Sequence, residues 1–182
     1  MYGFRRWLLR QFGAQIGRGV RIRPSVTIPY PWKLQIGDYS WIGDHAVLYC
    51  FAKITIGKNA VVSQKSYLCA GTHDYRSPSF DIQAFPIVIE DEAWLAADVF
   101  IAPGVTIGRG TVVGSRSSVF SDLPTMMVCL GSPARPVRSR LQEPAGSCGS
   151  FRRVSVTEEF IDDAYVALNI VVVELGNIGV AR

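Results

Sequence analysis

Apolar residues recur at every sixth position along most of this chain. The series runs in four blocks: Ile16, Ile22, Ile28; Ile36, Ile42, Leu48, Ile54; Ile56, Val62, Leu68; and Ile89, Leu95, Ile101, Ile107, Val113, Val119. Four positions after most of them stands a small or β-branched residue: Val20, Val26, Ser40, Ala46, Ala60, Ser66, Ala93, Val99, Val105, Thr111, Ser117. This period matches neither an α-helix nor a simple β-strand. It predicts short strands joined by tight turns and stacked as parallel coils, which is a parallel β-helix.

Glycine directly follows several of the apolar residues, as in Ile36-Gly37 and Ile56-Gly57. We interpret these glycines as points where the backbone turns sharply, and the small residues as occupants of crowded corners. The core of such a fold is a column of stacked apolar side chains. Function is therefore expected on its outer faces or between subunits.

Three segments interrupt the repeat. Residues 28–37 and 54–57 each shift its phase by two positions, which indicates bulged corners. The third break, between Leu68 and Ile89, is too long and too polar for one regular hexad, and it predicts a protruding loop over residues 73–86. Loops that leave a rigid scaffold are common places for binding and catalysis.

The two ends differ from the repeat domain, which we assign to residues 14–140. Residues 1–13 are expected to form a short helix, with Phe4, Leu8 and Phe12 on one stripe among arginines. This helix either caps the open end of the coils or attaches the protein to a membrane surface. Residues 141–182 lack the repeat and form an extra C-terminal tail to which we assign no function.

Composition limits the remaining classes. A chain of 182 residues with 48% hydrophobic content is large enough for one domain with its own core. It lacks a long apolar run or a secretory leader, so we expect a cytoplasmic protein. The cysteines Cys50, Cys69, Cys129 and Cys148 are widely spaced, which favours reduced structural thiols. A net charge of +4 permits a phosphorylated ligand but does not indicate a nucleic-acid partner.

His73 is the candidate for chemistry. It stands in the phrase GTHD at the start of the protruding loop, and histidine titrates near neutral pH, as a general base must. On these residues alone, a loop histidine that only bonds to the backbone is the favoured interpretation. Asp74 either orients His73 or forms a turn.

The motifs together are similar to a known family. The text RPSVTIPYPWKLQIGDYSWIGD, ITIG, SQKSYLCAGTHD, PIVI, WLAADVFIAPGVTIG, GTVVGSRSSVF and GSPA resembles the colanic acid biosynthesis acetyltransferases. These belong to the hexapeptide-repeat acyltransferases, together with the galactoside, maltose and nodulation O-acetyltransferases. The likeness covers roughly residues 4–140; family members carry a longer N-terminal segment, so this chain is expected to start short.

The resemblance implies a left-handed β-helix, a homotrimer with active sites between subunits, and acetyl-CoA as the acyl donor. It implies a sugar or sugar-linked lipid as the acceptor, in exopolysaccharide biosynthesis, and no metal. Carried over position by position, His73 is the general base for direct attack of a hydroxyl on the thioester. The other positions are Trp94, Ala97 and Ser115 along the donor, Arg135 and Arg138 at its nucleotide end, and Asp44 and His45 as possible acceptor-side groups.

Other functions remain as alternatives. A zinc hydratase on the same scaffold needs three histidines, and this chain has two. A non-catalytic scaffold for assembly or a membrane surface would keep the repeat without needing His73. An acetyltransferase for an amino sugar, an antibiotic or an amino acid would share the donor site and differ only in acceptor contacts.

Overall fold

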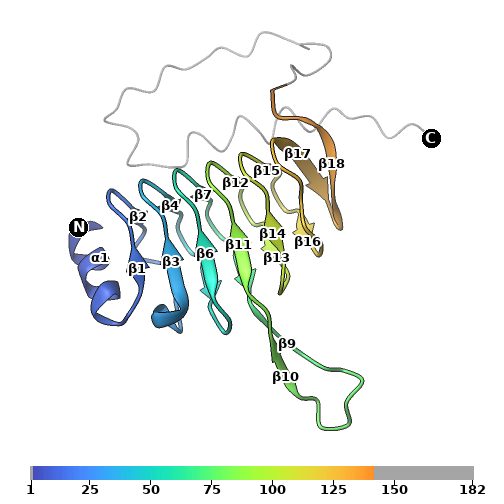
Figure 1. Cartoon of the computed structure of the whole chain (residues 1–182), viewed down its shortest axis with the longest axis horizontal. Helices are drawn as coiled ribbons and strands as arrows, with labels where there is room; N and C mark the ends of the chain where they lie inside the picture. The colour runs from blue at the N-terminus through green and yellow to red at the C-terminus, as the bar shows by residue number, and fades with distance from the viewer. Residues whose placement is uncertain (1, 142–182) are drawn as a thin grey trace. The chain divides into compact units, whose positions relative to one another are not determined.

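The computed structural model describes residues 2–141, so all of the predicted tail but its first residue lies outside the described residues. The chain up to Arg140 is one compact unit. It consists of parallel coils, each built from three short strands (Figure 1). The fold class predicted from the repeat, an all-β parallel β-helix with a short N-terminal helix, is confirmed.

Three parallel sheets form the faces of the β-helix. Sheet A contains β1 (Gln15–Ile16), β3 (Leu34–Ile36), β6 (Ile54–Ile56), β11 (Ile87–Ile89) and β14 (Thr106–Ile107). Sheet B contains β2 (Arg21–Ile22), β4 (Trp41–Ile42), β7 (Val61–Val62), β12 (Trp94–Leu95), β15 (Val112–Val113), β17 (Met127–Gly131) and β18 (Ala134–Ser139). Sheet C contains β5 (Val47–Tyr49), β8 (Tyr67–Cys69), β13 (Phe100–Ile101) and β16 (Ser118–Val119).

The sixth-position residues fill the core in register. On sheet B, Ile42 pairs with Val62, Val62 with Leu95, and Leu95 with Val113. The residues of the series are buried, except for Ile28, which is half-buried and packs against the core. The coils therefore contribute apolar side chains on every face to a continuous column, two of them at strands such as β3 and β6, and the outward residues are left free for other roles.

Corner AB joins sheet A to sheet B over residues 17–20, 37–40, 57–60, 90–93 and 108–111. Corner BC joins sheet B to sheet C over residues 23–26, 43–46, 63–66, 96–99 and 114–117. Both are four-residue turns in every coil. Except at Ser25 in the first coil, their third positions have a positive φ, such as 60° at Tyr39, 57° at His45, 61° at Glu92 and 65° at Gly19. The buried small residue follows at the fourth position; at Ser40, for example, the hydroxyl donates to Gly57 O at 2.6 Å.

The expected role of the glycines was wrong. Gly37 and Gly57 do not have a left-handed φ, and the sharp turn comes two residues later. They are needed because successive coils approach closely there. A Cβ on Gly37 would lie 2.7 Å from the backbone carbonyl carbon of Gly57 and from the backbone nitrogen of Lys58.

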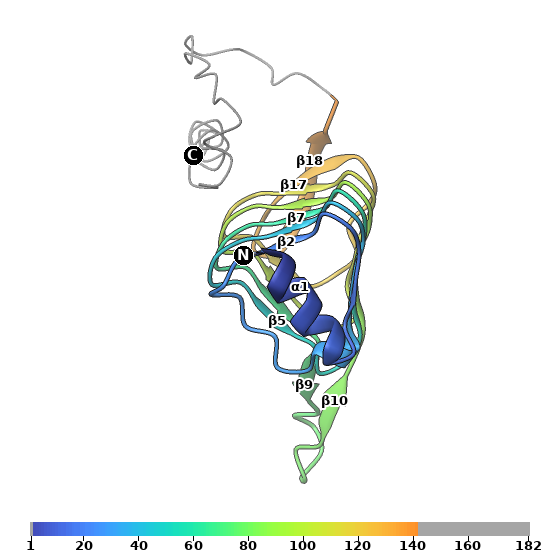
Figure 2. The same ribbon diagram turned by 90° about the vertical axis from the view of Figure 1, so that its left-hand side faces the viewer.

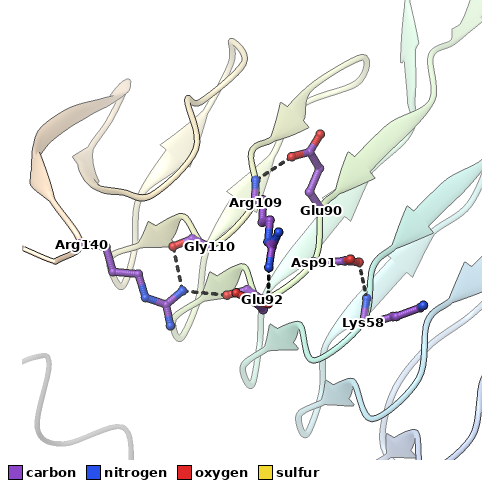
Figure 3. Close-up of polar contacts among 7 residues, drawn as sticks. All are labelled: Lys58, Glu90, Asp91, Glu92, Arg109, Gly110 and Arg140. Atoms are coloured by element: carbon purple, nitrogen blue, oxygen red, sulfur yellow. Dashed lines mark hydrogen bonds and ion pairs between the residues drawn. The ribbon is translucent and has the colours of Figure 1, made fainter.

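Acidic side chains and arginines tie corner AB together (Figure 3). Asp91 Oδ1 accepts from the backbone nitrogen of Lys58 at 2.7 Å, and Glu90 Oε2 accepts from that of Arg109 at 2.6 Å. Arg140, at the end of the unit, donates to the carbonyls of Glu92 and Gly110 at 2.8 and 2.7 Å. These hydrogen bonds therefore link successive coils at corner AB.

Corner CA, which joins sheet C to the next strand of sheet A, varies in every coil. It holds the 3₁₀ helix η1 (Pro31–Lys33), a bend over residues 50–53, a long excursion over residues 70–86 and a plain turn at 102–105. The excursion contains an antiparallel hairpin of β9 (Gly71–His73) and β10 (Ile82–Ala84), in which His73 pairs with Ile82. Figure 1 shows this hairpin projecting from the body of the β-helix.

The helix α1 (Tyr2–Gln11) lies across the N-terminal end of the coils (Figure 2). No helix among the described residues is long and apolar enough to cross a membrane.

Candidate active site

His73 is the last residue of β9, and its side chain is exposed on the projecting hairpin. Its Nδ1 lies 2.8 Å from the carbonyl oxygen of Phe80, and its ring stacks on the Phe80 ring with centroids 4.7 Å apart. A carbonyl oxygen can only accept a hydrogen bond, so Nδ1 carries the proton. The lone pair of Nε2 is then available to take a proton from a substrate, as a general base requires.

Asp74 makes turn contacts. Its Oδ1 accepts from the backbone nitrogen of Arg76 at 3.0 Å, and its Oδ2 lies 3.4 Å from Nε2 of Gln83. An aspartate whose carboxylate accepts from the backbone nitrogen two residues later forms an Asx turn. The group that orients the His73 ring in this chain is thus Phe80, which the sequence interpretation did not single out.

The tip of the hairpin is held by a second carboxylate. Asp81 Oδ2 accepts from the hydroxyls of Ser77 and Ser79 at 2.9 and 2.7 Å. These hydrogen bonds lower the pKa of Asp81 below its usual value. The hairpin therefore has its own polar network, which keeps Phe80 beside His73.

Ala97 and Ser115 occupy equivalent second positions of corner BC in successive coils. Arg116 donates its backbone nitrogen to Ala97 O at 2.9 Å, which stacks the two turns. The hydroxyl of Ser115 is buried and has no hydrogen-bond partner among the described residues. A buried hydroxyl without a partner is unfavourable, so this atom fits a ligand that runs along the corner.

Trp94 lies on the outer side of sheet B, three residues before Ala97. It is half-buried, pairs with Val61 and Val112, and donates Nε1 to the hydroxyl of Ser63 at 3.0 Å. The indole is thereby fixed beside corner BC with its ring on the outer surface.

A groove runs along the other side of corner BC, over sheet C. It is lined by Lys65, Tyr67, Cys69, Asp98, Val99 and Phe100. The rings of Tyr67 and Phe100 stack with centroids 6.2 Å apart and make an apolar floor. Lys65 and Asp98 place opposite charges at its edge.

Asp44 and His45 lie on the same corner, in an earlier coil. Asp44 is engaged by Arg23 Nε at 2.8 Å and by the Ser25 hydroxyl at 2.7 Å. Burial would raise the pKa of Asp44, but these two contacts outweigh it and the pKa is lowered. The carboxylate of Asp44 is therefore committed to the fold, while the His45 side chain is exposed at a left-handed corner position.

Arg135 and Arg138 lie on β18, which pairs antiparallel with β17 at the C-terminal end of sheet B. Arg135 is exposed and Arg138 half-buried. Arg135 Nη1 donates to Ala134 O at 2.9 Å, and Arg138 Nη1 donates to Ser139 O at 3.5 Å.

Within one chain the structure brings together only part of the predicted site. Trp94, Ala97 and Ser115 gather at corner BC, and Asp44 and His45 continue the same corner toward the N-terminus. His73 leaves from corner CA, which is the corner opposite sheet B in a three-sided β-helix. The predicted base and the predicted donor residue Trp94 therefore lie on different sides of one copy.

Sequence reasoning missed Phe80 and the groove residues Lys65, Tyr67, Cys69 and Phe100. A signal for the groove exists in the repeat, because Tyr67 and Phe100 each directly precede an inward apolar residue, where the side chain must point outward. The role of Phe80 carries no such signal, since it depends on how the hairpin folds back on itself.

Two of the described thiols are buried, and Cys69 lines the groove. Burial raises the pKa of Cys50 to about 12 and that of Cys129 to about 11. Among residues 2–141 no group of three or more His, Cys, Asp or Glu side chains could hold a metal ion. Cys148 lies outside the described residues.

Known proteins share the sequence and the fold of this chain. The chain is 60% identical over 142 residues to "Putative colanic acid biosynthesis acetyltransferase WcaF" of Escherichia coli, which covers 78% of each protein. It is 28% identical over 134 residues to the galactoside O-acetyltransferase of the same organism, covering 72% of this chain and 66% of that protein. No family profile matches the chain.

Solved structures give the same result. A hexapeptide-repeat-containing acetyltransferase of Vibrio cholerae superimposes with a TM-score of 0.73 at 30% identity, over 79% of this chain and 82% of that one. The same Vibrio protein has been solved in complex with acetyl coenzyme A. These matches confirm the left-handed β-helix and the use of a coenzyme A thioester that the resemblance implied. The chain therefore belongs to the hexapeptide-repeat acetyltransferases, in the group of the colanic acid biosynthesis acetyltransferases.

Proposed function

We propose that this acetyltransferase transfers an acetyl group to a sugar hydroxyl during exopolysaccharide biosynthesis, with His73 as the general base. The observation that carries the proposal is the hydrogen bond between His73 Nδ1 and Phe80 O, which makes Nε2 the atom with the lone pair in the neutral ring. The acceptor class is supported by the relative whose name refers to colanic acid biosynthesis. The acceptor is a sugar or a sugar-linked lipid.

The residues of this chain have separate tasks in the transfer. Nε2 of His73 accepts the proton of the acceptor hydroxyl as its oxygen attacks the thioester carbonyl carbon. The C–S bond then breaks, and the proton passes from Nε2 to the sulfur of the departing coenzyme A. Nδ1 keeps its own proton throughout and donates it in the hydrogen bond to Phe80 O, which prevents the ring from rotating away. Positive charge that develops on the imidazole is balanced locally by the Phe80 carbonyl dipole.

Acetyl-CoA supplies the activated acetyl group as a thioester. The residues at corner BC fit it, because the hydroxyl of Ser115 has an unused donor and Ala97 leaves room for a chain to lie against the backbone. Trp94 covers one side, and Arg135 and Arg138 offer cations to phosphates. Direct attack requires no covalent intermediate on the protein.

The separation of corner CA from sheet B leads us to a composite site. We infer that the hairpin of one copy reaches corner BC of a neighbouring copy, which makes a homotrimer the natural assembly, since three copies around one axis give three equal sites. The inference rests on the positions of His73 and Trp94 within one chain.

The test is the release of coenzyme A from acetyl-CoA with a panel of sugar and sugar-nucleotide acceptors. His73→Ala is expected to lower kcat/KM by about 10²- to 10⁴-fold, because a positioned base contributes that much. Arg18→Gln is the control, since Arg18 is exposed at corner AB and far from both parts of the site. Unchanged turnover in His73→Ala would refute the role of His73, and turnover with amino acceptors only would refute the sugar hydroxyl.

A further inference from the structure

The N-terminal end of the β-helix carries an apolar surface that the described residues leave uncovered. Three large side chains of α1 and one directly after it are exposed, with fractions of 67% at Phe4, 54% at Trp7, 38% at Leu8 and 59% at Phe12. The rings of Phe4 and Trp7 stack with centroids 5.8 Å apart. We call Phe4, Trp7, Leu8, Phe12 and Trp32 the terminal aromatic face.

Trp32 extends this face beyond the helix. It belongs to η1, is 59% exposed, and lies beside the end of α1, because a Cβ added to Gly13 would meet the Trp32 Cβ at 3.0 Å. Residues from two separate segments thus contribute to one end of the molecule, which Figure 2 shows with α1 nearest the viewer.

Most of the helix has the reverse of the usual orientation: Leu9 packs against the core, but Phe4, Trp7 and Leu8 are exposed. An amphipathic helix on a soluble protein normally buries its apolar stripe and leaves its cations in water. Here the arginines turn toward the coils and donate to backbone carbonyls of the first coil: Arg5 to Pro24 O and Val26 O at 2.9 and 2.7 Å, Arg6 to Val20 O at 2.9 Å, and Arg10 to Ile16 O at 3.0 Å.

These contacts explain why the aromatic side chains face outward. The first coil has no preceding coil to satisfy its carbonyls, and the arginines do so instead. No residue of α1 is buried. A helix that served only as a cap would have no need for two phenylalanines, a tryptophan and a leucine on the opposite side.

The charge around this end identifies what covers the face. The first 37 residues contain seven basic residues and no acidic one: Arg5, Arg6, Arg10, Arg18, Arg21, Arg23 and Lys33. Asp38 and Asp44 of the next coil pair with Arg18 and Arg23, which still leaves an excess of five positive charges at this end. The remainder of the chain has three more acidic than basic residues, since the whole carries +4. Two copies meeting end to end would bring like charges together, whereas an anionic surface would be attracted.

We propose that the terminal aromatic face docks on an anionic lipid bilayer. Its tryptophans and phenylalanines would enter the interfacial region, where such rings are favoured, and the net positive charge of this end would attract the anionic headgroups. At ten residues α1 is too short to span a bilayer, so the contact is peripheral. This proposal does not depend on the acceptor or on the role of His73.

The test is co-sedimentation of the full chain with vesicles of phosphatidylcholine alone and with vesicles containing one part phosphatidylglycerol to two parts phosphatidylcholine. We expect binding to the second kind only, weakened by salt. Phe4→Ser/Trp7→Ser should lower the partition coefficient by more than about tenfold, because each ring loses its apolar burial. Phe120→Ser is the matched control, since Phe120 is 59% exposed at the other end of the coils.

Two results would overturn the proposal. One is equal binding of the wild type and Phe4→Ser/Trp7→Ser to the anionic vesicles. The other is measured without lipid, as the quenching of tryptophan fluorescence by iodide. Equal quenching of the wild type and Trp7→Phe would mean that Trp7 is already covered by protein. Sedimentation velocity then shows whether a second copy covers it.

Discussion

The corners of this β-helix divide into two kinds. Corners AB and BC repeat with the same four-residue turn in every coil, and their polar groups bond to the next coil, as Asp91 does with Lys58. Corner CA differs in every coil and releases the hairpin that carries His73. Regular corners hold the coils together and constrain each other, while an irregular corner can change without disturbing the stack. Four predictions test this difference.

The largest expected effect comes from removing the excursion at corner CA. Replacing residues 72–83 by an Asn-Gly turn joins Gly71 to Ala84, which are already partners in the hairpin. Acetyl transfer should fall at least about 10³-fold, as the base is lost, while the melting temperature stays close to that of the wild type. A coenzyme A release assay measures acetyl transfer, and calorimetry measures the melting temperature. A collapse of stability would show that corner CA also holds the fold.

The second prediction concerns corner AB. Gly37→Ala places a Cβ 2.7 Å from the backbone of Gly57, which cannot move without separating two coils. We expect a loss of about 3 kcal/mol in the free energy of unfolding, measured by urea denaturation. Gly3→Ala is the control, because a Cβ there meets nothing within 4 Å. Equal stability of the two variants would mean that the coils are not closely stacked at this corner.

A third, smaller effect is expected at the Phe80 ring. Phe80→Ala keeps the carbonyl that accepts from His73 and removes only the stacking. Such a contact is worth roughly 0.5 to 1.5 kcal/mol, so kcat should fall by about two- to tenfold. The pH profile of kcat should shift with it, because Phe80 acts through His73. Phe85→Ala, at the other end of the hairpin, should leave the profile unchanged.

The smallest effect is the response of corner BC to acid. The pKa of Asp44 is lowered in the folded state, since its contacts with Ser25 and Arg23 outweigh burial. Its contribution to stability is therefore present above the unfolded pKa of about 3.9 and is lost as pH falls through the lower folded value. The melting temperature of Asp44→Asn should lie below that of the wild type at neutral pH, and the gap should narrow in acid. A gap independent of pH would contradict the ion pair with Arg23.

The same division explains what the sequence could predict. The column of core residues such as Ile42, Val62 and Leu95 follows directly from the sixth-position pattern, because every coil imposes the same burial. His73 was found because the pattern stops near it. Phe80 could not be found, since its carbonyl reaches His73 only through the pairing of β9 with β10.

The residues of the candidate site could be named from the sequence, but their positions in space could not. The resemblance supplied Trp94, Ala97 and Ser115, and the structure places all three at one corner. The interpretation of Gly37 as a turn was wrong because a repeat does not distinguish a special φ from a close approach between coils. The direction in which Arg5 and Arg6 point was equally hidden, as it depends on unsatisfied carbonyls at the end of the coils.

The central claim is that His73 of one copy acts with corner BC of another, and mixing two inactive variants tests it most directly. His73→Ala lacks the base, and Ser115→Trp fills the donor corner. When the two are unfolded together and refolded, mixed assemblies should recover about a quarter of the wild-type coenzyme A release, since one in four neighbouring pairs then combines an intact His73 with an intact corner. Activity no higher than that of the separate variants would contradict the shared site.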